Sequence, residues 1–531
     1  MALRAAVGGG LLLVGCAGPS NQESVTQGVR SSAGTLHYVD ARKGSDANPG
    51  TSSRLPWRSL SKVNATLFAP GDKVLFAGGQ VFEGTLYVGR QSNGTKDRPI
   101  VIGSFGRGRA TLQGGSGDGV VLTDCAFVTV RELKIVGCGR KNGSDGAGVR
   151  MIRTQGVDLN AIEVSGFRLA GVATGGDRNT RITRVYAHDN GFAGITTDGG
   201  RPDIPRSRDL YIGYCVAENN PGDPKNLTNH SGNGIVVGGV DGAVIEYCEA
   251  MNNGWDMPWK GNGPVGIWGW NCDRLVIQHC ISHDNKTVSG AVDGGGFDLD
   301  GGATHSTLQY NLSYNNHGCG YLLCQYPGAA PWKDNTCRYN ISVNDGLTNH
   351  FSGIYFWAGG PDISNAQVYN NVILNSRHAV VSTHDIAGLV FRNNIFVSEG
   401  DILAGPLAHA RFENNLYWST GDGAIYRSGD TVYAKLADWA KATGQETADG
   451  RLASLFADPR LVMPGKGQTL PTDPPHLSRM LLYRLRQDSP CAGRGMPIAD
   501  NGGKDFFGHR VLNGRRPSLG VHEAPVARQP R

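Results

Sequence analysis

Residues 233–253, NGIVVGGVDGAVIEYCEAMNN, decide the fold because they contain one complete copy of a unit that recurs along the chain. The copy has a glycine followed by a short apolar strand at residues 234–237, then Tyr247-Cys248-Glu249, and ends at Asn253. The centre of the unit returns at intervals of 21 to 33 residues between about residues 180 and 420. The centres are Tyr214-Cys215-Val216, Tyr247-Cys248-Glu249, His279-Cys280-Ile281, Tyr310-Asn311-Leu312, Tyr339-Asn340-Ile341, Asn370-Asn371-Val372, Asn393-Asn394-Ile395 and Asn414-Asn415-Leu416. A repeat of this length predicts a solenoid.

A second polar position follows five residues after each centre. It is occupied by Asn190, Asn220, Asn253, Asn285, Asn316 and Asp345. No unit contains an amphipathic run long enough for a helix, and each has a glycine-rich turn before a short alternating strand. Such strands cannot bury a face alone, so each coil must stack on its neighbours.

This pattern resembles the right-handed parallel β-helix, the fold of pectate lyases, polygalacturonases and many bacterial carbohydrate-active proteins. The resemblance implies ladders of stacked asparagines in the turns. Cys215, Cys248 and Cys280 occupy the position that later coils fill with asparagine. We therefore expect buried free thiols in one column, with disulfides as the alternative.

Both ends of the chain also resemble this class. Residues 59–68 predict a short amphipathic helix that would cover the open end of the solenoid and its unpaired strand edges. Tyr483-Arg484-Leu485, Asp505-Phe506-Phe507-Gly508 and Gly520-Val521-His522-Glu523 resemble a closing segment. We expect an all-β, single-stranded right-handed parallel β-helix over residues 35–425 and a C-terminal capping or closing segment over residues 426–531.

The N-terminal residues predict export. Arg4 precedes an apolar run, and Leu13-Val14-Gly15-Cys16 resembles a bacterial lipobox, in which Cys16 would be lipidated. The interpretation is a lipoprotein signal peptide over residues 1–16, a flexible tether over residues 17–34, and a lipid anchor on the periplasmic or cell-surface side of a bacterial membrane.

Composition agrees with strands and turns and disfavours some functions. The chain has 78 glycines in 531 residues and only 18% charged residues. Its formal net charge of +5 comes without a lysine or arginine run, so we expect no nucleic-acid partner and no membrane contact beyond the lipid. We expect a monomer that acts on a polysaccharide or oligosaccharide.

Side chains alternate along a strand, so aligning the coils on their shared glycine–apolar pair assigns each position to one face. The inward column is Ile195, Ile235, Ile267, Phe297, Tyr321, Ile354 and Val380. The two outward columns are Thr196, Val236, Trp268, Asp298, Leu322, Tyr355 and Val381, and then Asp198, Gly238, Trp270, Asp300, Cys324, Trp357 and Thr383. One face thus presents aromatics beside a pair of aspartates, which is what a glycan groove needs.

Three functions fit this face. In a glycoside hydrolase, one of Asp298 and Asp300 would be the general acid, and the other would activate water or act as the nucleophile, with no cofactor. In a polysaccharide lyase, Asp293, Asp298 and Asp300 would hold Ca²⁺ while Lys260 or His317 removes a proton. In a non-catalytic glycan-binding protein, the same residues would only bind. The proposed sugar-binding residues are Trp268, Trp270, Tyr355, Trp357, Trp259 and Tyr321.

Overall fold

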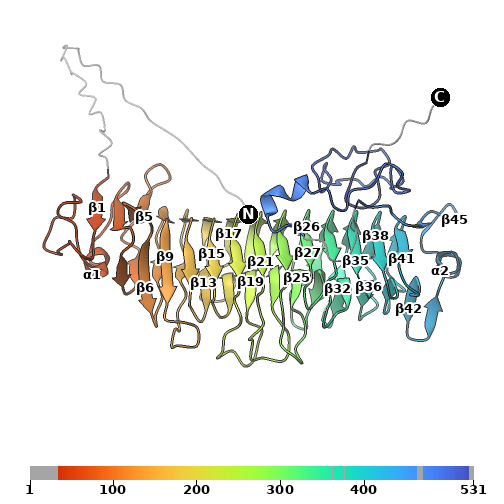
Figure 1. The fold of residues 1–531 in the computed structure, drawn as a ribbon, viewed down its shortest axis with the longest axis horizontal. Coiled ribbons are helices and arrows are strands. Elements are labelled where there is room, and N and C mark those ends of the chain that lie inside the picture. The colour runs from red at the N-terminus through yellow and green to blue at the C-terminus, as the bar shows by residue number, and fades with distance from the viewer. Residues whose placement is uncertain (1–33, 361–362, 376, 463–469, 525–531) are drawn as a thin grey trace, which may run out of the picture. The chain divides into compact units, whose positions relative to one another are not determined.

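Three long parallel sheets form the body of the molecule, and the chain passes through them in turn (Figure 1). The computed structural model describes residues 34–360, 363–375, 377–462 and 470–524. The predicted signal peptide, Cys16 and all but the last residue of the predicted tether lie outside the described residues. Within them, no helix is long and apolar enough to cross a membrane.

Each sheet contains 14 strands. Sheet 1 runs from β1 (Leu36–Val39) to β40 (Arg411–Glu413), and sheet 3 runs from β3 (Val81–Glu83) to β46 (Leu455–Phe456). Sheet 2 consists of β4 (Leu86–Val88), β7 (Val120–Thr123), β10 (Val149–Ile152), β13 (Ala170–Gly175), β16 (Ala193–Asp198), β19 (Asn233–Gly238), β22 (Val265–Trp270), β25 (Gly295–Leu299), β28 (Tyr321–Gln325), β32 (Ser352–Ala358), β36 (His378–Ser382), β39 (Leu403–Ala404), β42 (Tyr426–Ser428) and β43 (Thr431–Tyr433). All neighbours in sheet 2 are parallel except β42 and β43. The predicted parallel β-helix is confirmed.

The register of sheet 2 follows the alignment made from the sequence. Ile267 pairs with Phe297, and Phe297 pairs with Tyr321, which in turn pairs with Ile354. These inward side chains are fully buried in the main core. In the first outward column, Trp268 pairs with Asp298. The inward column and this outward column therefore lie on the faces that the sequence assigned to them.

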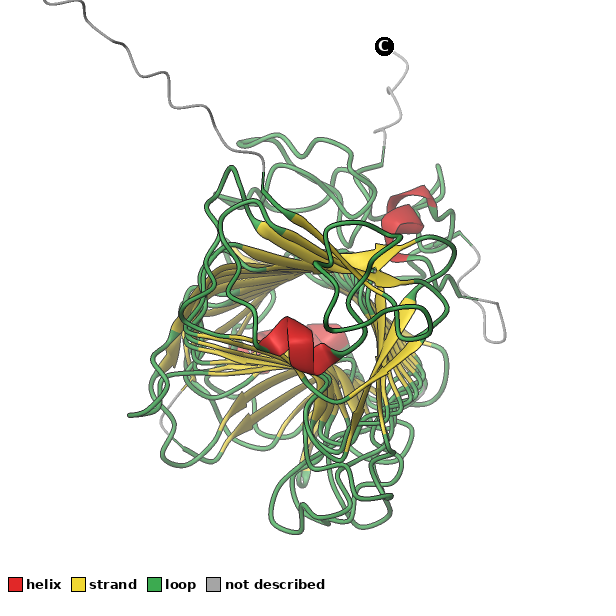
Figure 2. Cartoon of the chain, turned by 90° about the vertical axis from the view of Figure 1, so that its left-hand side faces the viewer, coloured by secondary structure: helices red, strands yellow, loops and turns green. Residues whose placement is uncertain are grey.

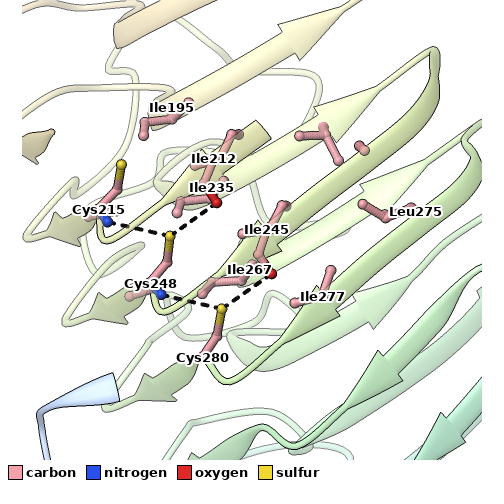
Figure 3. Close-up of a cluster of buried hydrophobic side chains, with 14 of the residues drawn as sticks. Ile195, Ile212, Cys215, Ile235, Ile245, Cys248, Ile267, Leu275, Ile277 and Cys280 are labelled. Atoms are coloured by element: carbon pink, nitrogen blue, oxygen red, sulfur yellow. Dashed lines mark hydrogen bonds between the residues drawn. The ribbon is translucent and has the colours of Figure 1, made fainter. Parts of the chain in front are cut away.

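The side-chain ladder is also as predicted. Cys215, Cys248 and Cys280 are free thiols stacked in neighbouring coils (Figure 3). The backbone N–H of each of the first two donates to the next sulfur, at 3.5 Å and 3.4 Å. The N–H of Cys280 then donates to Oδ1 of Asn311 at 3.0 Å, where the asparagine rungs begin.

A short helix lies across the N-terminal opening of the β-helix (Figure 2). This helix, α1 (Leu60–Asn64), begins after Ser59, whose side chain accepts from the N–H of Lys62, and it buries Leu60 and Val63. The predicted capping helix is present and ends at Asn64, earlier than the predicted residue 68.

The β-helix continues beyond residue 425. Strand β46 adds a last rung to sheet 3, and α2 (Leu436–Thr443) buries Leu436 and Trp439 in the main core. Glu446 takes the ladder position there and accepts from Nδ2 of Asn415 at 2.7 Å. Because this rung has glutamate in place of asparagine, the repeat pattern does not reveal it.

The rest of the C-terminal segment, including the 3₁₀ helix η1 (Pro474–Arg479), packs on the outer face of sheet 3 and does not close the end (Figure 1). It covers an apolar column of the sheet formed by Ile281, Leu312, Ile341, Val372, Ile395 and Leu416. It therefore acts as a lateral cover for a face that would otherwise expose apolar side chains.

Candidate active site

A cavity of about 860 Å³ lies over the outward face of sheet 2. Its wall combines strand residues of β16, β19, β22, β25, β28 and β32 with residues of the connections that precede β19, β22, β25 and β32. These connections include residues 221–232, 254–264 and 286–294, and the segment after β28 contributes Tyr326. Its volume is within the range of about 300–1,000 Å³ that is typical of ligand sites.

Asp298 is the most buried acid of the cavity. It lies in β25 between Trp268 and Leu322 of the neighbouring coils, and only 3% of its surface is exposed. Among the described residues, its Oδ1 atom has no hydrogen-bond partner. Burial, followed by the nearby charges of Asp300 and Asp293, holds the pKa of Asp298 well above its ordinary value. The surroundings of Asp298 therefore favour its protonated, neutral form.

Asp300 follows β25 in the second outward column. The backbone N–H of Gly301 donates to its Oδ1 at 2.7 Å, and the Cys324 thiol of the next coil also donates to the carboxylate. Burial raises the pKa of Asp300 to about 6, while these two donors oppose the rise. Asp300 is thus the acid of the three that ionises first.

Asp293 lies in the connection before β25, in a left-handed backbone conformation with φ of 59°. The N–H of Gly263 donates to its Oδ2 at 2.8 Å. Burial raises the pKa of Asp293 to about 7, opposed by that hydrogen bond and assisted by the charge of Asp300. A carboxyl with this pKa can act as a proton donor near neutral pH.

The aromatic residues of the two outward columns line the cavity but differ in how far their side chains are exposed. Trp268 is 4% exposed and donates from Nε1 to Oδ1 of Asn233 at 3.0 Å, so it is a fixed wall. Trp270, Tyr355 and Trp357 also line the cavity and are partly exposed. These three present the aromatic surface that a sugar ring could contact.

Four predicted site residues lie outside the cavity. Tyr321 belongs to the inward column, is fully buried and donates from its hydroxyl to the carbonyls of Asn311 and Ile341; its assignment to sugar binding was wrong. Lys260 is exposed, and Trp259 donates from Nε1 to Oδ1 of the lining residue Asn262; neither Lys260 nor Trp259 lines the cavity itself.

His317 is the fourth of these residues. Its ring nitrogen Nδ1 lies 3.3 Å from the backbone nitrogen and 3.2 Å from the carbonyl oxygen of Thr287, and its own carbonyl accepts from the N–H of Asn349 at 3.1 Å. It therefore supports the loops behind the cavity, and neither predicted proton acceptor, Lys260 nor His317, reaches the space where a substrate would lie.

Two lining histidines were missed from the sequence. His230 contacts Phe192 and Trp268 and its Nδ1 atom lies 3.0 Å from Nδ2 of Asn233; burial lowers its pKa to about 4. His350 lies beside Asp293. Both histidines lie in loops that have no repeat to align. The only signal in the sequence is a histidine inside a long insertion between two repeats.

The three aspartates do not form a compact metal site. Among the residues that the structure describes, their ligand atoms are not grouped within 4.8 Å of one another. The residues present therefore do not fit the expected Ca²⁺ site.

One group of possible ligand atoms elsewhere does lie within 4.8 Å of one another. It consists of Asp505, His509 and His522 of the C-terminal segment. Oδ1 of Asp505 accepts from the N–H of Phe507 and of His509, and Oδ2 accepts from the N–H of Glu523. Nδ1 of His522 accepts from the N–H of Leu485. These bonds connect Asp505 and His522 to the backbone of the C-terminal segment, so both side chains have a structural role there.

The stacked sheets and this lateral cavity define a right-handed parallel β-helix protein, and comparison with known proteins agrees. The family model described as right-handed β-helix region matches residues 225–432. The match covers the coils of the cavity from β19 onward, whereas β16, which also lines it, precedes the matched range.

Among known proteins, this chain is similar to a lacto-N-biosidase of Bifidobacterium longum subsp. longum, with 25% identity over 495 residues. The alignment covers 71% of this chain, which spans 30% of the length of that relative. Among solved structures, a GH136 lacto-N-biosidase from Eubacterium ramulus has a TM-score of 0.50 at 20% identity, covering 74% of this chain and 67% of that one. The alginate lyase AlyGC of family PL6 has the same TM-score at 14% identity, covering 75% and 53%. These structural similarities establish the fold.

Proposed function

We propose that this chain is a glycoside hydrolase that cleaves a neutral oligosaccharide in the cavity on sheet 2, using Asp300 and Asp293 as its two carboxyls. The observation that carries the proposal is the presence of three aspartates with raised pKa values in one aromatic-walled cavity. Perturbed carboxyls in a cleft are typical of catalytic sites. The similarity to proteins named lacto-N-biosidases supports the same reaction class.

The charge of the cavity favours hydrolysis over the lyase alternative. Its lining contains four acids, Asp198, Asp293, Asp298 and Asp300, and among the described residues no lysine or arginine lines it. A lyase must bind the carboxylate of a uronic acid and neutralise it before proton removal. The residues that line this cavity offer no cationic side chain for that neutralisation, and an ionised Asp300 would oppose a second carboxylate nearby.

The roles of the carboxyls follow from their protonation. Asp300, with a pKa of about 6, is ionised near neutral pH and serves as the nucleophile or the base that activates water. Asp293, with a pKa of about 7, retains a proton for the departing glycosidic oxygen. Asp298 is nearly inaccessible and its surroundings favour its protonated form, so we assign it to the wall of the site and not to the reacting pair, in place of the expected Asp298–Asp300 pair.

A purely glycan-binding role would need no unusual acids. Burying three carboxyls together costs stability, since each prefers water when ionised. Retaining that arrangement in the cavity favours catalysis over binding alone. We further propose that the protein is exported and anchored through Cys16, and that it meets its oligosaccharide outside the cytoplasm.

The test is a substrate panel offered to the purified chain with either Ca²⁺ or EDTA. The panel contains aryl glycosides, including an aryl lacto-N-bioside, neutral oligosaccharides, alginate and pectate. We expect new reducing ends from a neutral glycan, unchanged by EDTA. Unsaturated products from alginate or pectate that disappear with EDTA would support the lyase, and binding without turnover would support the non-catalytic role.

A further inference from the structure

We propose that His350 is a positioning residue that holds the Asp293 carboxyl in the orientation needed to protonate the leaving oxygen. The inference deepens the proposed function and rests on it. His350 lies in the connection between β31 (Ile341–Val343) and β32, and Asp293 lies in the connection before β25, two coils earlier. The Nε2 atom of His350 is 3.4 Å from Oδ1 of Asp293, and the two side chains are only 7% and 15% exposed.

The hydrogen bonds around the ring define its tautomer. The backbone N–H of Cys319 donates to Nδ1 of His350 at 3.5 Å, so Nδ1 carries no proton. Burial lowers the pKa of His350 to about 3, so the ring is neutral and its single proton is on Nε2. The Nε2 atom that carries this proton lies 3.4 Å from Oδ1 of Asp293.

Asp293 is consequently held at both oxygens. His350 faces Oδ1, while the N–H of Gly263 donates to Oδ2 at 2.8 Å. The backbone is held as well, because Nδ2 of Asn349 donates to the Asp293 carbonyl at 2.9 Å. Each carboxyl oxygen still has a second lone pair, and the transferable proton occupies one of these positions.

The His350 ring is itself fixed. It stacks on the Tyr355 ring with a centroid separation of 4.0 Å and an interplanar angle of 15°. His350 and Phe351 both have positive φ, 57° and 47°, and they are the one such consecutive pair without glycine in the described chain. Strained backbone of this kind persists where the surrounding structure enforces it, and it is concentrated at functional sites.

The test compares His350→Ala with His350→Gln in the full chain. Glutamine can place an N–H where Nε2 lies, whereas alanine cannot. We expect His350→Ala to lower kcat up to about 100-fold with little change in KM, because misplacing a reacting group costs rate more than binding. His350→Gln should recover most of kcat.

His305→Ala is the matched control. His305 also has positive φ, 50°, and its Nδ1 atom contacts Oδ1 of Asp273 at 2.7 Å, but it lies on sheet 1 away from the cavity. It should leave kcat and KM unchanged. Equal losses in His350→Ala and His350→Gln, or a wild-type kcat in a folded His350→Ala protein, would overturn the proposal.

Crystal structures of the two variants separate failure of this inference from failure of the proposed function. If the wild-type chain cleaves no glycan, the hydrolase assignment fails. The positioning role is then decided by whether Asp293 leaves the Gly263 N–H in His350→Ala and keeps it in His350→Gln. An unmoved Asp293 in both variants contradicts the role.

Discussion

Asp293, Asp298 and Asp300 share a cavity but differ in their donors, and this difference sets their chemistry. Asp293 and Asp300 each accept a backbone N–H, whereas Oδ1 of Asp298 has no partner among the described residues. A hydrogen bond to the charged form favours ionisation, so the two supported carboxyls titrate nearer to neutral pH. Their separate environments assign one as proton donor and the other as base or nucleophile.

The first prediction is a bell-shaped dependence of kcat/KM on pH. Activity should fall below about pH 6 as Asp300 gains a proton, and above about pH 7 as Asp293 loses its own. The measurement is kcat/KM for the best substrate of the panel between pH 4 and pH 9. A profile that keeps rising to pH 9 would contradict the assignment of Asp293 as the acid.

Cys324→Ala provides a directed change within that profile. The Cys324 thiol donates to Asp300 and opposes the rise of its pKa, so its loss should move the acidic limb to higher pH. The basic limb, set by Asp293, should remain in place. Cys319→Ala is the matched control, since this buried thiol has no such bond to Asp300 and should leave the acidic limb unchanged.

At the scale of the element, each ladder rung joins one coil to the next by side-chain bonds inside the turn. Nδ2 of Asn340 donates to the carbonyl of Leu308 and to Oδ1 of Asn371, while its oxygen accepts from the N–H of Asn311. A thiol rung satisfies the same backbone N–H through a weak acceptor, as the Cys248 sulfur does for Cys215.

We therefore predict that Asn340→Ala destabilises the protein more than Cys248→Ala. Removing Asn340 leaves buried backbone groups without partners, which should lower the free energy of unfolding by about 3 kcal/mol. Removing the Cys248 sulfur forfeits weaker bonds and should cost less. The check is urea unfolding of both variants, and equal shifts of the midpoint would refute the difference between rungs.

The coils could be predicted from the sequence because a ladder position and an inward apolar position recur in each one. The same alignment correctly brought Trp268, Trp270, Asp298, Asp300, Tyr355 and Trp357 to one face. The loops have no repeat, so the places of His230, His350, Lys260 and His317 depend on tertiary packing that the sequence pattern does not encode. The alignment placed Tyr321 in the inward column, and this placement should have excluded it from the sugar-binding residues despite its aromatic ring.

At the scale of the whole molecule, several carboxyls are buried with raised pKa values. Besides Asp293 and Asp300, these include Asp345 at about 6 and Glu446 at about 7, both of which end or extend ladders. Each binds its proton more tightly when folded than when unfolded. Their stabilising contribution is complete below the unfolded pKa and is lost as pH rises through the folded pKa.

The corresponding prediction is that the free energy of unfolding falls between pH 6.5 and pH 8, on the order of 2 kcal/mol in total. Buried neutral histidines such as His230 and His350 act in the opposite direction, but only below about pH 6.5. Urea unfolding at several pH values measures the slope. Asp293→Asn should make it shallower, and an unchanged slope in that variant would count against a protonated Asp293.

The most direct test of the central claim is turnover by Asp300→Asn, Asp293→Asn and Asp298→Asn on one neutral glycan substrate. We predict losses of kcat of at least about 100-fold for Asp300→Asn and Asp293→Asn. Asp298→Asn replaces a carboxyl whose protonated form is favoured by burial with a neutral amide of similar shape, so it should retain activity within about tenfold of wild type. A full loss in Asp298→Asn, with near wild-type kcat in Asp293→Asn, would contradict the account and return the acid role to Asp298.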